Sequence, residues 1–348
     1  MAAEPTWQGL AKGILVLGVL WWTWVGYAWL TSAVDPEEGS VRVSMFAAMA
    51  GLLVVGLCVP EAFDHLALLF AGAYAVVRYG QIALLWLASR GDAGYRRSVT
   101  GLIGSSTVGI SLLALASLFD GPLQGAVWAV ALVLDMAGPF FFGSEGWHLQ
   151  PAHFAERHGL IVLIALGESI VAIGVGAGHT VDAGVVVAAV LGTALAAGLF
   201  MLYFDVVALV AARRLANAEE GRERNEVARD SFSYLHFPMV AGIVLVALGM
   251  KKTLAHVGDP LHVEIATALL GGVALYLVAH VAFRYRNVHR FSTQRLVCAL
   301  VLLALIPAAV AIPALVTLAI VVVLLSVLIG YERVRFAELR ERLRHQLV

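Results

Sequence analysis

Apolar segments of about 20 residues recur along the whole chain, and a helix of that length crosses a hydrocarbon core of about 30 Å. Eleven such spans are predicted, at residues 10–33, 43–60, 66–89, 98–118, 123–143, 158–178, 183–212, 232–250, 262–283, 295–312 and 314–332. The last two share one apolar stretch that contains Pro307 and Pro313, so we expect a turn near residues 311–313. The sequence therefore predicts an all-α integral membrane protein.

The composition excludes other classes of protein. Of the 348 residues, 61% are hydrophobic and 14% are charged, whereas a soluble domain has about half and about a quarter. An intrinsically disordered chain has the opposite bias. The formal net charge of −1 gives no general basic field for binding nucleic acid. Cys58 and Cys298 lie in apolar runs without a metal-ligand spacing, so we expect neither a metal nor another cofactor.

Basic residues are distributed unequally between the two sides of the predicted spans. Nineteen of the 23 lysine and arginine residues fall in alternate connections, starting after the first span, and in the C-terminal tail. Lys12, Lys251 and Lys252 lie on the other side, and Arg78 lies inside a span. Because cytoplasmic connections carry the excess of basic residues, the C-terminus is predicted to be cytoplasmic and the N-terminus of this chain extracytoplasmic.

An internal repeat predicts the domain organisation. Residues 46–65 align without gaps on residues 237–256, and the identical pairs are Phe46/Phe237, Ala50/Ala241, Gly51/Gly242, Val55/Val246, Leu57/Leu248 and His65/His256. The alignment gives a first repeat of five spans at residues 1–150 and a second of six spans, with the tail, at residues 151–348. We expect two parallel six-helix repeats, with the first helix of repeat 1 absent from this chain.

Five ionisable residues lie well inside the predicted spans, namely Arg78, Asp135, Glu168, Asp205 and His280. An unpaired charge at the bilayer centre costs on the order of 3 kcal/mol, so each should face protein or water. A buried ion pair between Arg78 and one carboxylate would simply fix helix packing. Three acids cannot all pair with one guanidinium, so at least one carboxyl is predicted to be protonated or to await a cation.

The sixth span carries the strongest candidate. Glu168 lies about halfway along it, with Ser169 as a hydrogen-bonding neighbour. Gly167, Gly174 and Gly178 recur at helical spacing, and the GxxxG motif from Gly174 to Gly178 predicts the close approach of another helix.

The cytoplasmic start of this span holds His153, Glu156 and Arg157. His153 and Glu156 are three residues apart and would share a helix face. A metal or proton-relay site and a solvated helix start are both open. We favour the solvated start, because a metal site needs further ligands at a recognised spacing.

Residues 153–174, with the sequence HFAERHGLIVLIALGESIVAIG, resemble the signature of the bacterial low temperature requirement protein A family. The first-span sequence WWTWVGYAW resembles that family's second helix, and the resemblance runs along the whole chain. It implies a polytopic bacterial membrane protein. The motif positions fall on His153, Glu156, Arg157, Gly159, Gly167, Glu168 and Ser169. Family members usually begin with a helix carrying a Glu-Leu-Phe-Phe-Asp-Leu-Val-Phe type motif, and this chain starts after that helix.

Transport is the leading functional hypothesis. We expect a proton or cation channel, or a proton-coupled transporter, with Glu168 as the central titratable group. Asp135, Asp205, Arg78 and His280 would form a supporting network. No P-loop, GxSxG or HExxH motif is present, which argues against an ATPase or a familiar hydrolase. The expected partners are the lipid bilayer and a proton or small cation, in the bacterial cytoplasmic membrane, with a homodimer as one oligomeric option.

Two alternatives are open. One is a membrane enzyme, or a small-molecule- or lipid-binding protein, that uses His153, Glu156 and Glu168 at a cytoplasm-facing cavity. The other is a non-catalytic scaffold or sensor, whose carboxylates would all be paired in a dry interior.

Overall fold

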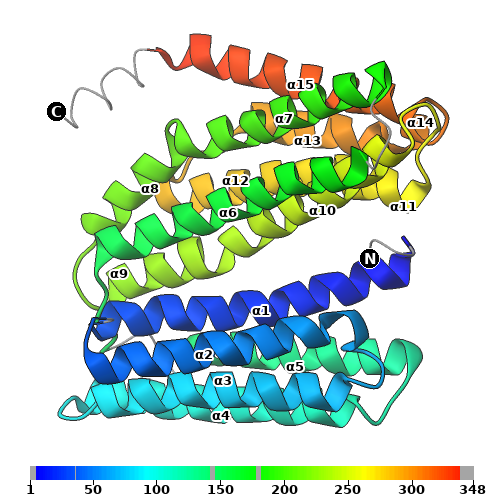
Figure 1. Cartoon of the computed structure of the whole chain (residues 1–348). Coiled ribbons are helices and arrows are strands. Elements are labelled where there is room, and N and C mark those ends of the chain that lie inside the picture. Colours follow the sequence, from blue (N-terminus) through cyan, green and yellow to red (C-terminus); the bar gives the residue numbers. More distant parts are fainter. Residues whose placement is uncertain (1–4, 36, 142–145, 178–181, 338–348) are drawn as a thin grey trace. The chain divides into compact units, whose positions relative to one another are not determined.

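The structure is a computed structural model, and it is built almost entirely of helices (Figure 1). It describes residues 5–35, 37–141, 146–177 and 182–337. Over these ranges, ten helices are long and apolar enough to cross a membrane. Each coincides with a predicted span, so the prediction of an all-α polytopic membrane fold is confirmed.

The chain divides by its contacts into two compact units. The N-terminal unit consists of Trp7–Phe154 and Ala216–Arg229. The C-terminal unit is built mainly from Ala155–Leu215 and from the chain that follows Asp230. The symmetry between two repeats, divided at residue 150, stays a prediction.

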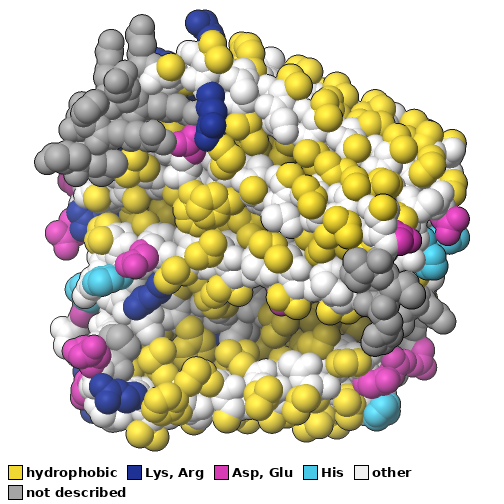
Figure 2. Space-filling view, turned by 45° about the horizontal axis from the view of Figure 1, so that its top comes forward, with side chains coloured by type: hydrophobic (Ala, Val, Ile, Leu, Met, Phe, Trp, Pro, Cys, Tyr) yellow, Lys and Arg dark blue, Asp and Glu magenta, His cyan; other side chains and the backbone are white. Residues whose placement is uncertain are grey.

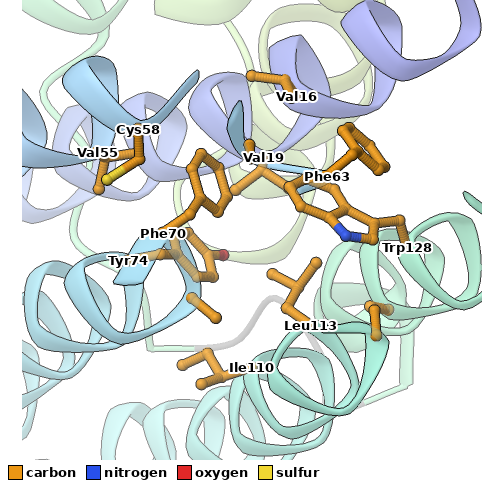
Figure 3. Packing of buried hydrophobic residues seen from close by; sticks show 14 residues of the cluster. Val16, Val19, Val55, Cys58, Phe63, Phe70, Tyr74, Ile110, Leu113 and Trp128 are labelled. Atoms are coloured by element: carbon orange, nitrogen blue, oxygen red, sulfur yellow. The ribbon is translucent and has the colours of Figure 1, made fainter. Parts of the chain in front are cut away.

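Five long helices make up most of the N-terminal unit: α1 (Trp7–Ala33), α2 (Gly39–Cys58), α3 (Ala67–Ala88), α4 (Ala93–Ala116) and α5 (Gly121–Phe141). α4 packs along α3 and α5, and α1 contacts the same α3 and α5. Their common core is rich in aromatic rings (Figure 3). The ring of Trp128 stacks on Phe63 with centroids 4.4 Å apart, and it lies 5.1 Å from the ring of Phe70.

The helices of the C-terminal unit are α6 (Pro151–Ala177), α7 (Ala183–Phe204), α8 (Val207–Ala216), α10 (His236–Ala255), α11 (Val263–Ala266), α12 (Gly272–Val288), α13 (Thr293–Ala304), α14 (Ile306–Ala309) and α15 (Ala314–Arg335). The backbones of α10 and α12 meet at Gly242, where a Cβ would lie 2.6 Å from the Gly272 carbonyl oxygen. Small residues permit this approach, as is usual between membrane helices.

The predicted span at residues 295–312 differs from expectation. Its apolar residues form the 12-residue α13 and, after a break at Leu305, the 4-residue α14. Pro307 has no N–H to bond the carbonyl of Leu303, so a helix cannot continue through it unbroken. The chain then turns at residues 310–313 before α15 begins, where the second proline predicted a turn. In the described part of the chain, this segment is therefore too short to count with the ten spanning helices.

Two other spans run beyond their predicted ends. Residues Ala183–Ala216 form one long helical segment with a break at Asp205. Helix α7 ends just before this residue, and α8 begins just after it, at Val207. The charged residues of α9 (Arg222–Val227) continue through a π-helical segment into α10. In Figure 2, apolar side chains cover most of the visible described surface, and most charged side chains gather toward its two edges.

Candidate functional site

A buried ion pair lies inside the N-terminal unit, between α3 and α5. Arg78 Nη2 is 3.4 Å from Asp135 Oδ1, and the two residues are 1% and 2% exposed. Asp135 also accepts hydrogen bonds from Tyr74 Oη at 2.8 Å and from Ser106 Oγ at 2.7 Å. Protein groups therefore satisfy this carboxylate on both oxygens.

The guanidinium of Arg78, like the carboxylate of Asp135, is hydrogen-bonded to several protein groups. Its Nε donates to Ser106 Oγ at 3.2 Å, and its Nη1 donates to Gln81 Oε1 at 2.7 Å. A Cβ on Gly26 of α1 would lie 2.5 Å from Arg78 Nη1, so the glycine leaves room for this side chain. The two predicted residues come together as a neutral pair whose contacts join four helices. This arrangement has the features of the packing pair that the sequence left open.

A second buried ion pair lies in the C-terminal unit, and sequence reasoning missed it. Arg295 of α13 donates from Nε to Glu332 Oε1 and from Nη2 to Oε2, each at 2.8 Å. The residues are 7% and 5% exposed. Gln294 Nε2 adds a hydrogen bond to Glu332 Oε1 at 3.1 Å. The sequence places Arg295 among the basic residues of a cytoplasmic connection. The one sequence signal for this ion pair is Glu332, an acid at the end of the last apolar run.

His280 of α12 joins this second pair. Its Nδ1 lies 2.8 Å from Arg295 Nη1. A guanidinium can only donate, so Nδ1 must accept and the ring proton must reside on Nε2. That Nε2 is buried and has no hydrogen-bond partner among the described residues. The predicted intramembrane histidine is thus part of an Arg295–Glu332 cluster.

Two further histidines, His158 and His236, belong to the same buried region as His280 and were not among the predicted site residues. His236 accepts at Nε2 from Tyr203 Oη at 2.8 Å, because its Nδ1 faces the Ser231 carbonyl at 3.0 Å and must donate. The Tyr203 ring lies 6.0 Å from the His280 ring, and the His158 ring lies 5.1 Å from the His236 ring. These rings from α6, α7, α10 and α12 form a continuous buried series.

Glu168 stands apart from both ion pairs. Its side chain is exposed on α6, and it makes no hydrogen bond or ion pair with any described residue. Ser169 is buried, and its hydroxyl donates to the Leu166 carbonyl at 2.6 Å. A Cβ added at Gly167 or Gly174 would meet no atom within 4 Å. The close helix approach expected at Gly167 and Gly174 is therefore absent from the described residues, and Gly178 lies outside them.

The other predicted site residues lie at helix ends. Asp205 is half-buried at the break between α7 and α8 and lines a cavity of about 440 Å³. His153 and Glu156 are exposed in the first turns of α6, and Arg157 is half-buried there. Nowhere in the described chain do three or more His, Cys, Asp or Glu residues gather closely enough to hold a metal ion.

Comparisons with known proteins identify the family. A family model described as bacterial low temperature requirement A protein matches residues 1–330. A protein of Rhizobium meliloti (strain 1021), described as uncharacterized protein RA0937, is 30% identical over 281 residues, which cover 77% of this chain and 67% of that relative. No solved structure matches the chain. With ten helices of membrane-crossing length in its described part, this polytopic membrane protein belongs to the bacterial low temperature requirement A protein family.

Proposed function

We propose that this protein carries protons or small cations across the membrane, as a channel or a proton-coupled transporter, and that Glu168 binds the cation. The observation that supports the proposal most is that the Glu168 carboxyl group is not compensated by another group of the described protein. It is exposed on a membrane helix and has no partner among the described residues. A charge in the middle of the bilayer costs on the order of 3 kcal/mol unless water or an opposite charge meets it.

The contrast with the paired acids strengthens this argument. Asp135 is matched by Arg78, and Glu332 is matched by Arg295, so each of these carboxylates is compensated within the protein. For a scaffold or sensor we expect every buried carboxylate to be compensated in this way. Glu168 departs from that pattern, which favours a role in which a proton or cation supplies the missing charge.

The faces of α6 also distinguish Glu168. Buried residues follow one stripe at helical spacing: Phe154, His158, Val162, Leu166, Ser169 and Ile173. Glu168 lies off this stripe, beside exposed apolar residues at positions one turn away, Ile164 and Val171. A protonated carboxyl carries no charge and suits such a surface better than a carboxylate does. Uptake and release of a proton at Glu168 would therefore change its preference for apolar surroundings.

Ion flux through reconstituted protein tests this proposal. The full chain is inserted into vesicles of phosphatidylethanolamine and phosphatidylglycerol, and internal pH is followed with a dye under an imposed membrane potential, with sodium and potassium flux measured in parallel. We expect flux of at least one of these ions for the wild type. Glu168→Gln should abolish it, because the amide cannot titrate or carry a charge. Glu168→Asp should retain part of it.

The matched control is Ile164→Gln, which places the same amide on the same exposed face one helical turn earlier. This variant should keep wild-type flux. Size-exclusion profiles and unfolding temperatures of all variants establish that they are folded. Wild-type flux in a folded Glu168→Gln variant would overturn the proposal, as would the absence of proton, sodium and potassium flux in the wild type.

A further inference from the structure

The cavity of about 440 Å³ in the C-terminal unit has apolar walls. Helices α7, α8, α12, α13 and α15 contribute to it, and the apolar lining includes Val207, Val210, Phe283 and Ile329. Its size falls in the range of pockets that hold small molecules, about 300–1,000 Å³. It lies at the helix ends that the distribution of basic residues predicts to be cytoplasmic. At this level the cavity would face the head groups of the cytoplasmic leaflet.

The charges that line this cavity do not balance. They are Asp205, Arg284, Arg290, Arg295 and Glu332, with three bases against two acids. Arg295 and Glu332 neutralise each other in their ion pair. Neither Arg284 nor Arg290 has a carboxylate within ion-pair distance among the described residues. The cavity therefore presents two arginines that no carboxylate of the described residues matches directly.

Each arginine is placed to receive an anion. The guanidinium of Arg284 lies over the ring of Phe336, 5.6 Å from its centroid, while Arg290 is exposed just beyond the end of α12. The planar guanidinium group donates two parallel hydrogen bonds to phosphate, which makes arginine well suited to this ligand. Basic pockets between membrane helices on the cytoplasmic side bind anionic head groups.

We propose that this cavity is a binding site for an anionic phospholipid. The head-group phosphate would bind at Arg284 and Arg290, and part of an acyl chain would lie along the valines of α8 and the apolar face of α15. A soluble anion would use the arginines but leave the apolar walls uncovered, so the combination favours an amphiphile. The site is separate from Glu168 and does not depend on the transport proposal.

Native mass spectrometry of the full chain in detergent, titrated with phosphatidylglycerol, tests this site. We expect a retained lipid on the wild type and weaker binding of Arg284→Gln/Arg290→Gln, by about thirtyfold for two surface arginines. The control Arg213→Gln/Arg214→Gln removes the same charge from α8 without touching the cavity lining and should bind as the wild type does. Phosphatidylcholine, which has no net charge, should not be retained.

A second variant keeps every charge and fills the cavity instead. Val210→Trp should lose the lipid while both arginines remain. Equal loss of lipid in the two double arginine variants would overturn the proposal, because it would indicate a general charge effect. Undiminished binding to folded Val210→Trp would also overturn it. Glycerol phosphate should not compete at the lipid's own concentration, and equal competition would identify a soluble anion and refute the lipid assignment.

Discussion

Arg295 and Glu332 are joined by two parallel hydrogen bonds, Nε to Oε1 and Nη2 to Oε2, each 2.8 Å long. The pair links α13 to α15 across 37 residues of sequence. Both residues are almost fully buried. A buried pair of this geometry is compensated while both partners are present, but loss of either partner leaves an uncompensated charge. The pair therefore fixes the position of the short α13 against the last spanning helix.

Replacement of Glu332 by Gln should strongly destabilise the protein. The change leaves the Arg295 guanidinium buried without its carboxylate, and the expected loss is about 3–5 kcal/mol in the free energy of unfolding. Chemical unfolding in mixed micelles measures this loss. The control is Glu226→Gln, because Arg222 and Glu226 form an exposed pair of the same 2.8 Å length. The control should lose less than about 1 kcal/mol, and similar losses in both variants would contradict the assigned importance of burial.

The hydroxyl of Tyr74 should contribute to the stability of the N-terminal unit. Tyr74→Phe removes a buried donor to Asp135, and we expect a loss of about 1–3 kcal/mol in the free energy of unfolding. Tyr79→Phe is the matched control, since its hydroxyl donates to the neutral hydroxyl of Thr107 on the next helix and should contribute only about 0.6 kcal/mol. If the two variants unfold at the same denaturant concentration, the hydrogen bond to Asp135 has no special weight.

The contact between α10 and α12 should not tolerate a side chain at Gly242. In Gly242→Ala the new methyl group would lie 2.6 Å from a backbone oxygen, so the helices must separate, at a cost of about 1–3 kcal/mol. Gly80→Ala in α3 meets no atom within 4 Å and should be neutral or stabilising by up to about 1 kcal/mol, because alanine favours the helix. Unfolding temperatures in detergent should fall for the first variant alone. A drop shared by both would point to a general requirement for glycine.

The predicted membrane orientation can be tested with single cysteines. Cys58 and Cys298, which are both buried, are first replaced by Ala. Asp259→Cys and Glu220→Cys then mark exposed positions on the predicted extracytoplasmic and cytoplasmic sides. A membrane-impermeant maleimide should label residue 259 in intact cells and residue 220 only after the membrane is permeabilised. The reverse pattern would invert the topology.

The sequence alone determined the architecture because the bilayer imposes a strong local rule. A stretch of about 20 apolar residues must form a helix with all backbone groups bonded internally, whatever its neighbours are. Ten spans could therefore be located without a structure, and Pro313 marked the turn before α15. Pro307 also indicates a local break, because proline interrupts a helix. A prediction that ended the helix before Pro307 would have given a span shorter than 295–312.

Tertiary structure alone decided which charges meet. Arg78 could have paired with any of three acids, and the packing of α3 and α5 against α4 and α1 selected Asp135. Arg295 looked like a loop residue until the fold brought it to Glu332 and His280. Pairing depends on helix order and rotation, which residues far apart in the chain fix jointly, and apolar periodicity carries little of that information. For the same reason, the sequence could propose Glu168 as a mid-membrane acid, but only the fold distinguished it from acids with a basic partner.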